Sequence, residues 1–80
     1  MNIKILGTGC AKCKSLEQVT RIAVAEMGIS AEVVKEEDIV NIMNYGVMRT
    51  PALVIDEIVA MSGRVPTLSE TKEILNKYRK

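Results

Sequence analysis

Two cysteines, Cys10 and Cys13, are the residues of this chain best suited to chemistry. They are its only cysteines, and they stand three positions apart after the segment Gly7-Thr8-Gly9. In the first turn of a helix their alpha carbons would lie about 5–6 Å apart, which suits a disulfide of low strain. The pair could therefore open and close a disulfide without moving the backbone, or bind a soft metal ion through two thiolates.

The expected position of the pair makes the two sulfurs unequal. Unpaired N–H groups and the positive end of the helix dipole would act on Cys10, and this arrangement lowers a thiol pKa to roughly 3.5–7.5 in Cys-X-X-Cys motifs. Lys12 and Lys14 add positive charge nearby. Cys13 shares helical spacing with Leu16, so it should be more buried and less ionised. We therefore expect Cys10 to attack a substrate disulfide and Cys13 to resolve the mixed disulfide.

The composition excludes many other kinds of chemistry. The chain has 80 residues, no histidine, 11 basic and 10 acidic residues, and two tyrosines as its aromatic residues. Without histidine there is no Ser-His-Asp triad and no imidazole metal ligand. A formal charge of +1 gives no electrostatic footprint for nucleic acid. No apolar run approaches the roughly 18 residues of a membrane span.

These exclusions lead to an expected location and an expected use for the cysteines. We expect a cytoplasmic protein that binds neither nucleic acid nor membranes. In that reducing compartment a close pair of cysteines is more often catalytic or metal-binding than structural.

The rest of the sequence predicts one small α/β domain over residues 1–80. Strands are expected at 3–6, 31–35, 52–55 and 58–61, and helices from the cysteine pair to Met27, from near Ile39 to before Gly46, and from 68 to about 78. Asp56-Glu57 would join the last two strands as a hairpin, and Thr67 with Glu70 would form a capping box. The order βαβαββα predicts a four-stranded mixed sheet with helices on both faces.

Two smaller groups of residues carry expectations of their own. The acidic run Glu36-Glu37-Asp38 is expected to begin the second helix rather than to bind a metal, because negative charge stabilises a helix N-terminus. Among the methionines, Met48 could line a substrate groove, whereas three fall on apolar stripes and are expected in the core: Met27, Met43 and Met61.

Segments spread along the whole chain resemble the small archaeal and bacterial thioredoxin-like proteins called redox-active disulfide protein 2. The matching segments are Gly7-Thr8-Gly9-Cys10-Ala11-Lys12-Cys13, Tyr45-Gly46-Val47, Thr50-Pro51-Ala52-Leu53-Val54-Ile55-Asp56 and Ser62-Gly63-Arg64-Val65-Pro66. The resemblance implies a minimal thioredoxin or glutaredoxin fold. It also implies an oxidoreductase that cycles Cys10 and Cys13 between dithiol and disulfide and reduces protein disulfides. Such a protein needs no bound cofactor or metal and takes electrons from a separate, thioredoxin-reductase-like donor; we expect a monomer.

The resemblance further implies which residues bind substrate. Pro51 corresponds to the family's cis proline, which packs beside the active cysteine. The main chain of Thr50 would then hold an extended substrate segment by β-augmentation. Gly9 stands where larger thioredoxins have Trp and leaves Cys10 more open, and Lys12 lies between the cysteines. The expected substrate-binding residues are therefore Gly9, Lys12, Thr50 and Pro51.

Lys4 marks a departure from the larger thioredoxins. Those proteins have a buried Asp beneath the cysteines as a proton acceptor, and the comparable position of the first strand holds Lys4. We expect Lys4 to be a snorkelling residue at a strand end and not a catalytic base. Water, or a carboxylate that the sequence does not locate, must then accept the proton of Cys13.

One alternative function uses the same two sulfurs. A strand, the segment Gly7 to Cys13 and a helix also resemble the entrance of heavy-metal-associated copper chaperone domains, in which two thiolates bind Cu(I). Those domains have the order βαββαβ and end in a strand. Here the sequence predicts a helix before the hairpin and another at the end, so the element order favours redox function. Carriage of Cu(I) or another soft metal remains the alternative.

Overall fold

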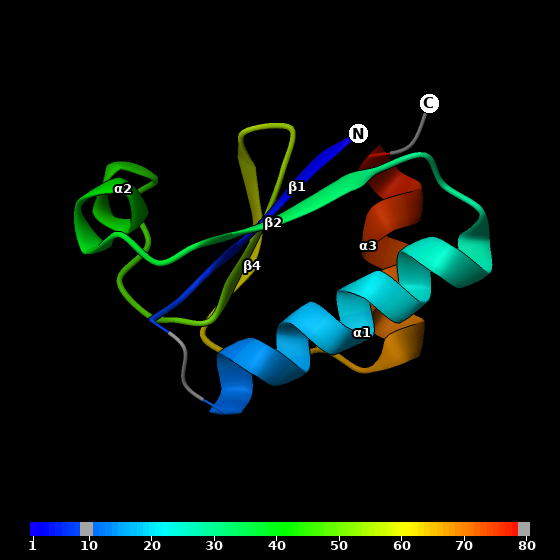
Figure 1. The fold of residues 1–80 in the computed structure, drawn as a ribbon, viewed down its shortest axis with the longest axis horizontal. Helices are drawn as coiled ribbons and strands as arrows, with labels where there is room; N and C mark the ends of the chain where they lie inside the picture. Colours follow the sequence, from blue (N-terminus) through cyan, green and yellow to red (C-terminus); the bar gives the residue numbers. More distant parts are fainter. Residues whose placement is uncertain (9–10, 79–80) are drawn as a thin grey trace.

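The computed structural model describes residues 1–8 and 11–78. Within them the chain runs through β1 (Asn2–Leu6), α1 (Ala11–Met27), β2 (Glu32–Glu36), α2 (Ile39–Asn44), β3 (Ala52–Ile55), β4 (Ile58–Ser62) and α3 (Leu68–Tyr78) (Figure 1). This is the βαβαββα order expected from the sequence, with small shifts at the strand boundaries. The expectations for Gly9 and Cys10 fall outside the described residues. None of the helices in the described part is both long and apolar enough to cross a membrane.

The strands form one mixed sheet in the order β2-β1-β3-β4. β1 and β2 are parallel and are connected through α1, whereas β3 is antiparallel to both β1 and β4. In this register Leu6, the last residue of β1, lies opposite both Glu36 and Ala52. The end of β1, from which the chain continues to the cysteines, therefore lies beside the start of β3, which Pro51 precedes.

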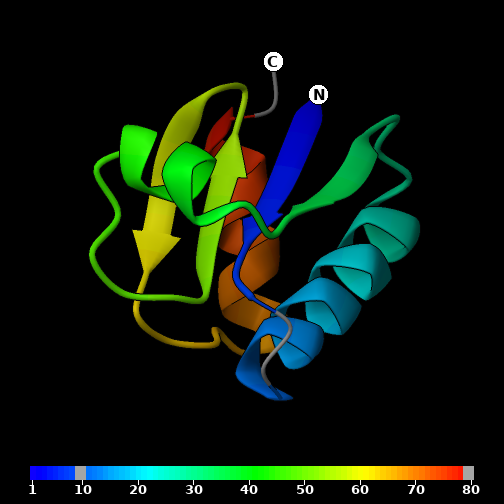
Figure 2. The same ribbon diagram turned by 60° about the vertical axis from the view of Figure 1, so that its left-hand side comes forward.

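Side chains along β1 alternate between two cores on opposite faces of the sheet. α2 and α3 lie on these opposite faces (Figure 2). The larger core lies against α1 and α3, and its buried residues are Ile3, Ile5, Leu16, Ala23, Leu53, Ile55 and Leu75. The smaller core lies on the side of α2 and consists of Leu6, Ile42, Val47, Ala52 and Val54.

Short-range signals in the sequence set the ends of several elements. The N–H of Thr67 donates to Glu70 Oε1 at 3.2 Å, and the N–H of Glu70 donates to Thr67 Oγ1 at 3.1 Å, so the predicted capping box is present. Gly28, directly after α1, has a φ of +65°, the left-handed conformation that ends many helices. Asp56 and Glu57 join β3 to β4 with φ values of 49° and 69°. Positive φ at both residues is the type I′ geometry of a two-residue hairpin.

Helix α2 differs from the expectation in how it begins and in what it buries. Glu36 is the last residue of β2, and Asp38 is the N-cap, whose Oδ1 accepts a hydrogen bond from the N–H of Val40 at 2.9 Å. Ile42 is buried, but Met43 is 67% exposed. The expected core position of Met43 is therefore wrong, because a helix of six residues covers only part of the sheet.

The other methionines follow the expectation more closely. Met27 and Met61 pack against the larger core, where they fill space between α1, α3 and the sheet. Met48 is 97% exposed in the segment between α2 and β3.

Candidate functional site

Cys13 lies in the first turn of α1, on the helix face that contacts the sheet. It is 6% exposed, and the same face buries Leu16, Thr20 and Ala23 at helical spacing. The expected burial of Cys13 is therefore confirmed. Because this stripe packs into the larger core, α1 holds the sulfur at a fixed depth beside the end of β1.

Gly7 brings the end of β1 against Cys13. A side chain on Gly7 would overlap the Cys13 sulfur, and its Cβ would lie 3.0 Å from the Cys13 Cβ. The N–H of Gly7 donates to the carbonyl of Glu36 at 3.0 Å, which extends the pairing with β2 by one residue and holds the backbone in place. The Cβ of Thr50 lies 4.0 Å from the same point. Gly7, Cys13 and Thr50 therefore meet, although they come from three separate segments.

The Thr50–Pro51 peptide bond is cis, as the family resemblance implied. Pro51 is buried, and its carbonyl accepts a hydrogen bond from the N–H of Gly63 at 2.9 Å. This bond links the segment before β3 to the turn after β4. Thr50 itself is exposed.

A small cavity of about 40 Å³ lies beside Cys13 and is lined by Ile5, Gly7, Cys13, Lys14, Lys35 and Glu37. It has room for at least one water molecule, which needs about 10–15 Å³. Glu37 supplies the carboxylate in this lining, directly after β2. Sequence reasoning assigned Glu37 to a helix start and missed this position. The signal was available, because the carboxyl ends of the parallel strands β1 and β2 must lie side by side.

Lys4 faces away from Cys13, into the α2 side of the sheet. Its Nζ donates to the Tyr45 hydroxyl at 2.8 Å and lies 3.1 Å from Glu57 Oε1, while the Tyr45 hydroxyl donates to Glu57 Oε2 at 2.9 Å. The expected position of Lys4 at a strand end is wrong. Lys4 is the middle residue of β1, and it connects this strand to the end of α2 and to the hairpin turn.

These contacts shift the ionisation of both charged groups. The hydrogen bond to Tyr45, followed by that to Glu57, holds the pKa of Lys4 above its ordinary value. The hydrogen bonds from Lys4 and then from Tyr45 hold the pKa of Glu57 below its ordinary value. Each bond favours the charged form of the group that makes it. Lys4 and Glu57 therefore form an ion pair on the face of the sheet opposite Cys13, and the Tyr45 hydroxyl is hydrogen-bonded to both.

Comparison with known proteins relates the whole described fold to one family. Residues 1–76 match the family model described as a thioredoxin domain. The chain is 40% identical over 76 residues to a thioredoxin of Methanocaldococcus jannaschii, a match that covers 95% of this chain and 87% of the relative. It is 42% identical over 76 residues to a thioredoxin of Methanothermobacter thermautotrophicus, covering 95% of this chain and 99% of the relative.

A solved structure agrees with the architecture. The structure of thioredoxin 1 from the thermophilic eubacterium Thermosipho africanus TCF52B matches with a TM-score of 0.66, over 98% of this chain and 93% of that chain. The two sequences are 20% identical, so this match shows a common fold.

Proposed function

Because the chain belongs to the thioredoxin family, we propose that it is a thiol-disulfide oxidoreductase whose working groups are Cys10 and Cys13. The observation that carries the proposal is the meeting of Cys13 with Gly7 and Thr50, which puts a buried cysteine beside an exposed residue of the segment before β3. The element order also supports it, since the chain has a helix before its hairpin and ends in a helix. Copper chaperone domains have a different order, so redox exchange is favoured over Cu(I) carriage.

The reaction transfers two electrons to a client disulfide in two exchange steps. The Cys10 thiolate attacks one client sulfur, which forms a mixed disulfide and releases the other client sulfur as a thiolate. The Cys13 thiolate then attacks the Cys10 sulfur, which closes the Cys10–Cys13 disulfide and releases the second client thiolate. The clients are proteins that contain a disulfide. A separate, thioredoxin-reductase-like donor returns two electrons to the pair.

Substrate contact is assigned to the residues around the pair. The exposed backbone of Thr50, held by the buried Pro51, would bind an extended client segment as an added strand. Lys12 is exposed in the first turn of α1 and would flank the same segment, as would Gly9 before the first cysteine.

Glu37 is the group to which we assign the proton of Cys13. Burial disfavours a thiolate, so the Cys13 thiol needs an acceptor before it can attack Cys10. Glu37 lines the same cavity as Cys13, and one water molecule there can carry the proton from the thiol to the carboxylate. Lys14 and Lys35 line this cavity too, and their positive charges favour the thiolate that remains.

The test combines a disulfide reduction assay with trapping of the mixed disulfide. The protein is expected to accelerate the reduction of insulin by dithiothreitol. Cys13→Ser is expected to stall at the mixed disulfide and to retain clients covalently on Cys10, whereas Cys10→Ser retains none. Titration with Cu(I) runs in parallel. A pair that neither oxidises reversibly nor reduces insulin, but binds Cu(I) tightly, would replace the redox function with metal carriage.

A further inference from the structure

The basic side chains of the described residues fall into two groups. Five of them form ion pairs with carboxylates: Lys4, Arg21, Lys35, Arg64 and Lys72. Four basic side chains within residues 1–8 and 11–78 form none: Lys12, Lys14, Arg49 and Lys77. Lys77 lies in the last turn of α3, where the helix dipole stabilises a cation. Lys12, Lys14 and Arg49 have neither an ion pair within the described residues nor a position in the last turn of a helix.

These three residues are neighbours of Cys13 or of Thr50 in the chain, and we call them the basic rim. Lys12 and Lys14 are exposed and flank Cys13 in the first turn of α1. Arg49 is also exposed and comes directly before Thr50, whose Cβ lies 4.0 Å from the point where Gly7 meets Cys13. The basic rim therefore comes from two segments of the chain, one that contains Cys13 and one that ends at Thr50.

The side chain of Arg49 has a defined support. Its Cβ and Cδ lie 3.6 and 3.7 Å from the position that a Cβ on Gly63 would occupy. Gly63 in turn is hydrogen-bonded to the carbonyl of Pro51 at 2.9 Å. The aliphatic part of Arg49 thus rests on the turn after β4. Its guanidinium forms no ion pair with a carboxylate of the described residues.

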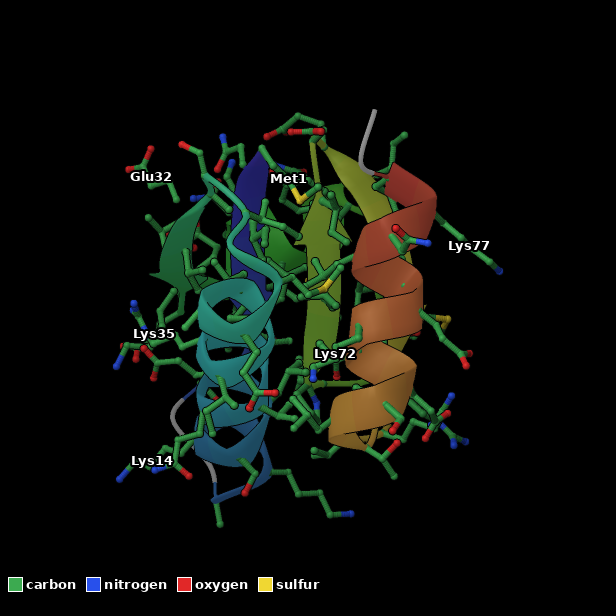
Figure 3. All side chains as sticks on the ribbon, turned by 90° about the vertical axis from the view of Figure 1, so that its right-hand side faces the viewer. Met1, Lys14, Glu32, Lys35, Lys72 and Lys77 are labelled. Atoms are coloured by element: carbon green, nitrogen blue, oxygen red, sulfur yellow. The ribbon has the colours of Figure 1, made fainter. Side chains whose placement is uncertain are left out.

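Nearby carboxylates balance only part of the charge of the basic rim. Glu70 lies 2.9 Å from Arg64, and this pair holds the pKa of Glu70 below its ordinary value. Glu17 is paired with Arg21 and Lys35. Figure 3 shows Lys14 at one end of the molecule and Glu32 and Lys77 toward the other. Glu37 lines the cavity beside Cys13 together with Lys14 and Lys35, so it offsets only part of this charge. Among the described residues the end that contains Cys13 therefore carries an excess of positive charge, although the formal charge of the whole chain is only +1.

We propose that the basic rim is a docking surface for an acidic segment of the client protein, next to the disulfide that is reduced. This inference rests on the proposed redox function and names its substrate class. Positive charges grouped around a reactive site raise the encounter rate with a negative partner and suppress encounters with a positive one. Met48 is 97% exposed and precedes Arg49, so it adds an apolar contact at the edge of the same surface.

Two peptides with the same disulfide-closed ring provide the test, one with three Glu residues beside the ring and the other with three Lys residues. The pre-reduced protein is mixed with each peptide, and the second-order rate constants of reduction are compared. At low ionic strength we expect the acidic peptide to react about tenfold faster or more. In about 1 M salt, where the Debye length is about 3 Å, the ratio should fall toward one.

Charge-reversal variants locate the effect on the surface. Lys12→Glu and Arg49→Glu are each expected to lower the ratio of the two rate constants several-fold. Lys77→Glu makes the same change in net charge at the other end of the molecule. It should leave the ratio within about twofold of the value for the unsubstituted protein. Using a ratio removes any effect of these charges on thiol reactivity, because that effect is common to both peptides. Circular dichroism confirms that each variant is folded.

The outcomes separate this inference from the proposed function. If both peptides are reduced at equal rates at low salt, the acidic-client proposal is overturned and the redox function stands. The acidic-client proposal is also overturned if Lys77→Glu lowers the ratio as much as Arg49→Glu does. If neither peptide nor insulin is reduced, it is the redox function itself that fails.

Discussion

The sulfur of Cys13 occupies the space that a side chain on Gly7 would need. Neither residue can easily retreat, because Gly7 is hydrogen-bonded to the carbonyl of Glu36 and Cys13 belongs to the buried stripe of α1. The absence of a side chain at position 7 is therefore a condition for the depth at which Cys13 lies.

Gly7→Ala should destabilise the reduced protein by about 1–3 kcal/mol, which is the usual cost of overpacking a tight site. Most of this cost should disappear in a Cys13→Ala background, since the atom nearest to the new methyl group is then gone. Urea unfolding of the four proteins of this double-mutant cycle measures both quantities. Equal costs of Gly7→Ala in the two backgrounds would contradict the contact with Cys13.

Thr20 and Thr71 form a matched pair for a test of buried hydroxyls. Both are fully buried, on α1 and α3 respectively. Within the described residues Thr20 Oγ1 has no hydrogen-bond partner, whereas Thr71 Oγ1 donates to the carbonyl of Thr67 at 2.9 Å. We expect Thr20→Val to stabilise the protein by about 1 kcal/mol and Thr71→Val to destabilise it by about 0.5–1 kcal/mol. Denaturant unfolding that gave the same sign for both would contradict this assignment.

The ion pair of Lys4 and Glu57 predicts a specific dependence of stability on pH. The pKa of Glu57 is lowered in the folded state, so its contribution is complete above the unfolded value of about 4.3 and is lost as the pH falls through the lower folded value. The pKa of Lys4 is raised, so its contribution is present below about pH 10.4 and is lost as the pH rises through the higher folded value.

Glu57→Gln should therefore lower the free energy of unfolding by a constant amount between about pH 5 and 9, and the difference from the unsubstituted protein should shrink in stronger acid. Urea titrations at a series of pH values measure this difference. Glu73→Gln, which changes an exposed carboxylate of α3 outside the ion pairs of the described residues, is the control and should have little effect at any pH. A difference for Glu57→Gln that persists undiminished in acid would argue against the ion pair.

Glu37→Gln tests the assigned proton acceptor. When the reduced protein reacts with 5,5′-dithiobis(2-nitrobenzoate), attack by Cys10 is expected to release one thionitrobenzoate, and attack by Cys13 on the resulting mixed disulfide is expected to release a second. We expect the variant to slow the second release about tenfold or more at neutral pH and to approach the unsubstituted rate as the pH rises, because hydroxide replaces the carboxylate. Glu32→Gln, at the far end of β2, serves as the control. A purely structural role of Glu37 would not produce recovery at high pH.

Local patterns in the sequence predicted the fold well, because their partners are close together in the chain. Thr67 and Glu70 are three residues apart, and the two turn residues Asp56 and Glu57 lie directly between the strands that they join. The cis bond before Pro51 is a different case. No local pattern indicated it, and only the resemblance to a family implied it.

Predictions from the sequence were wrong where they depended on which segments of the chain meet in space. Counting along the chain puts Lys4 at a strand end, but the face that it points to depends on the pairing of β1 with its neighbours. Glu37 approaches Cys13 because β1 and β2 end side by side. Met43 is exposed because α2 is short. Each of these facts belongs to the packing of elements, which apolar periodicity does not determine.

The alternation along β1 has a consequence for how this chain can change in evolution. Ile3 and Ile5 face α1, while Lys4 and Leu6 face α2. Inserting or deleting a single residue between Lys4 and Gly7 would reverse the face of Lys4 and move a lysine into the apolar layer beneath Cys13. A substitution at one of these positions changes one side chain, whereas a change in length alters both cores at once.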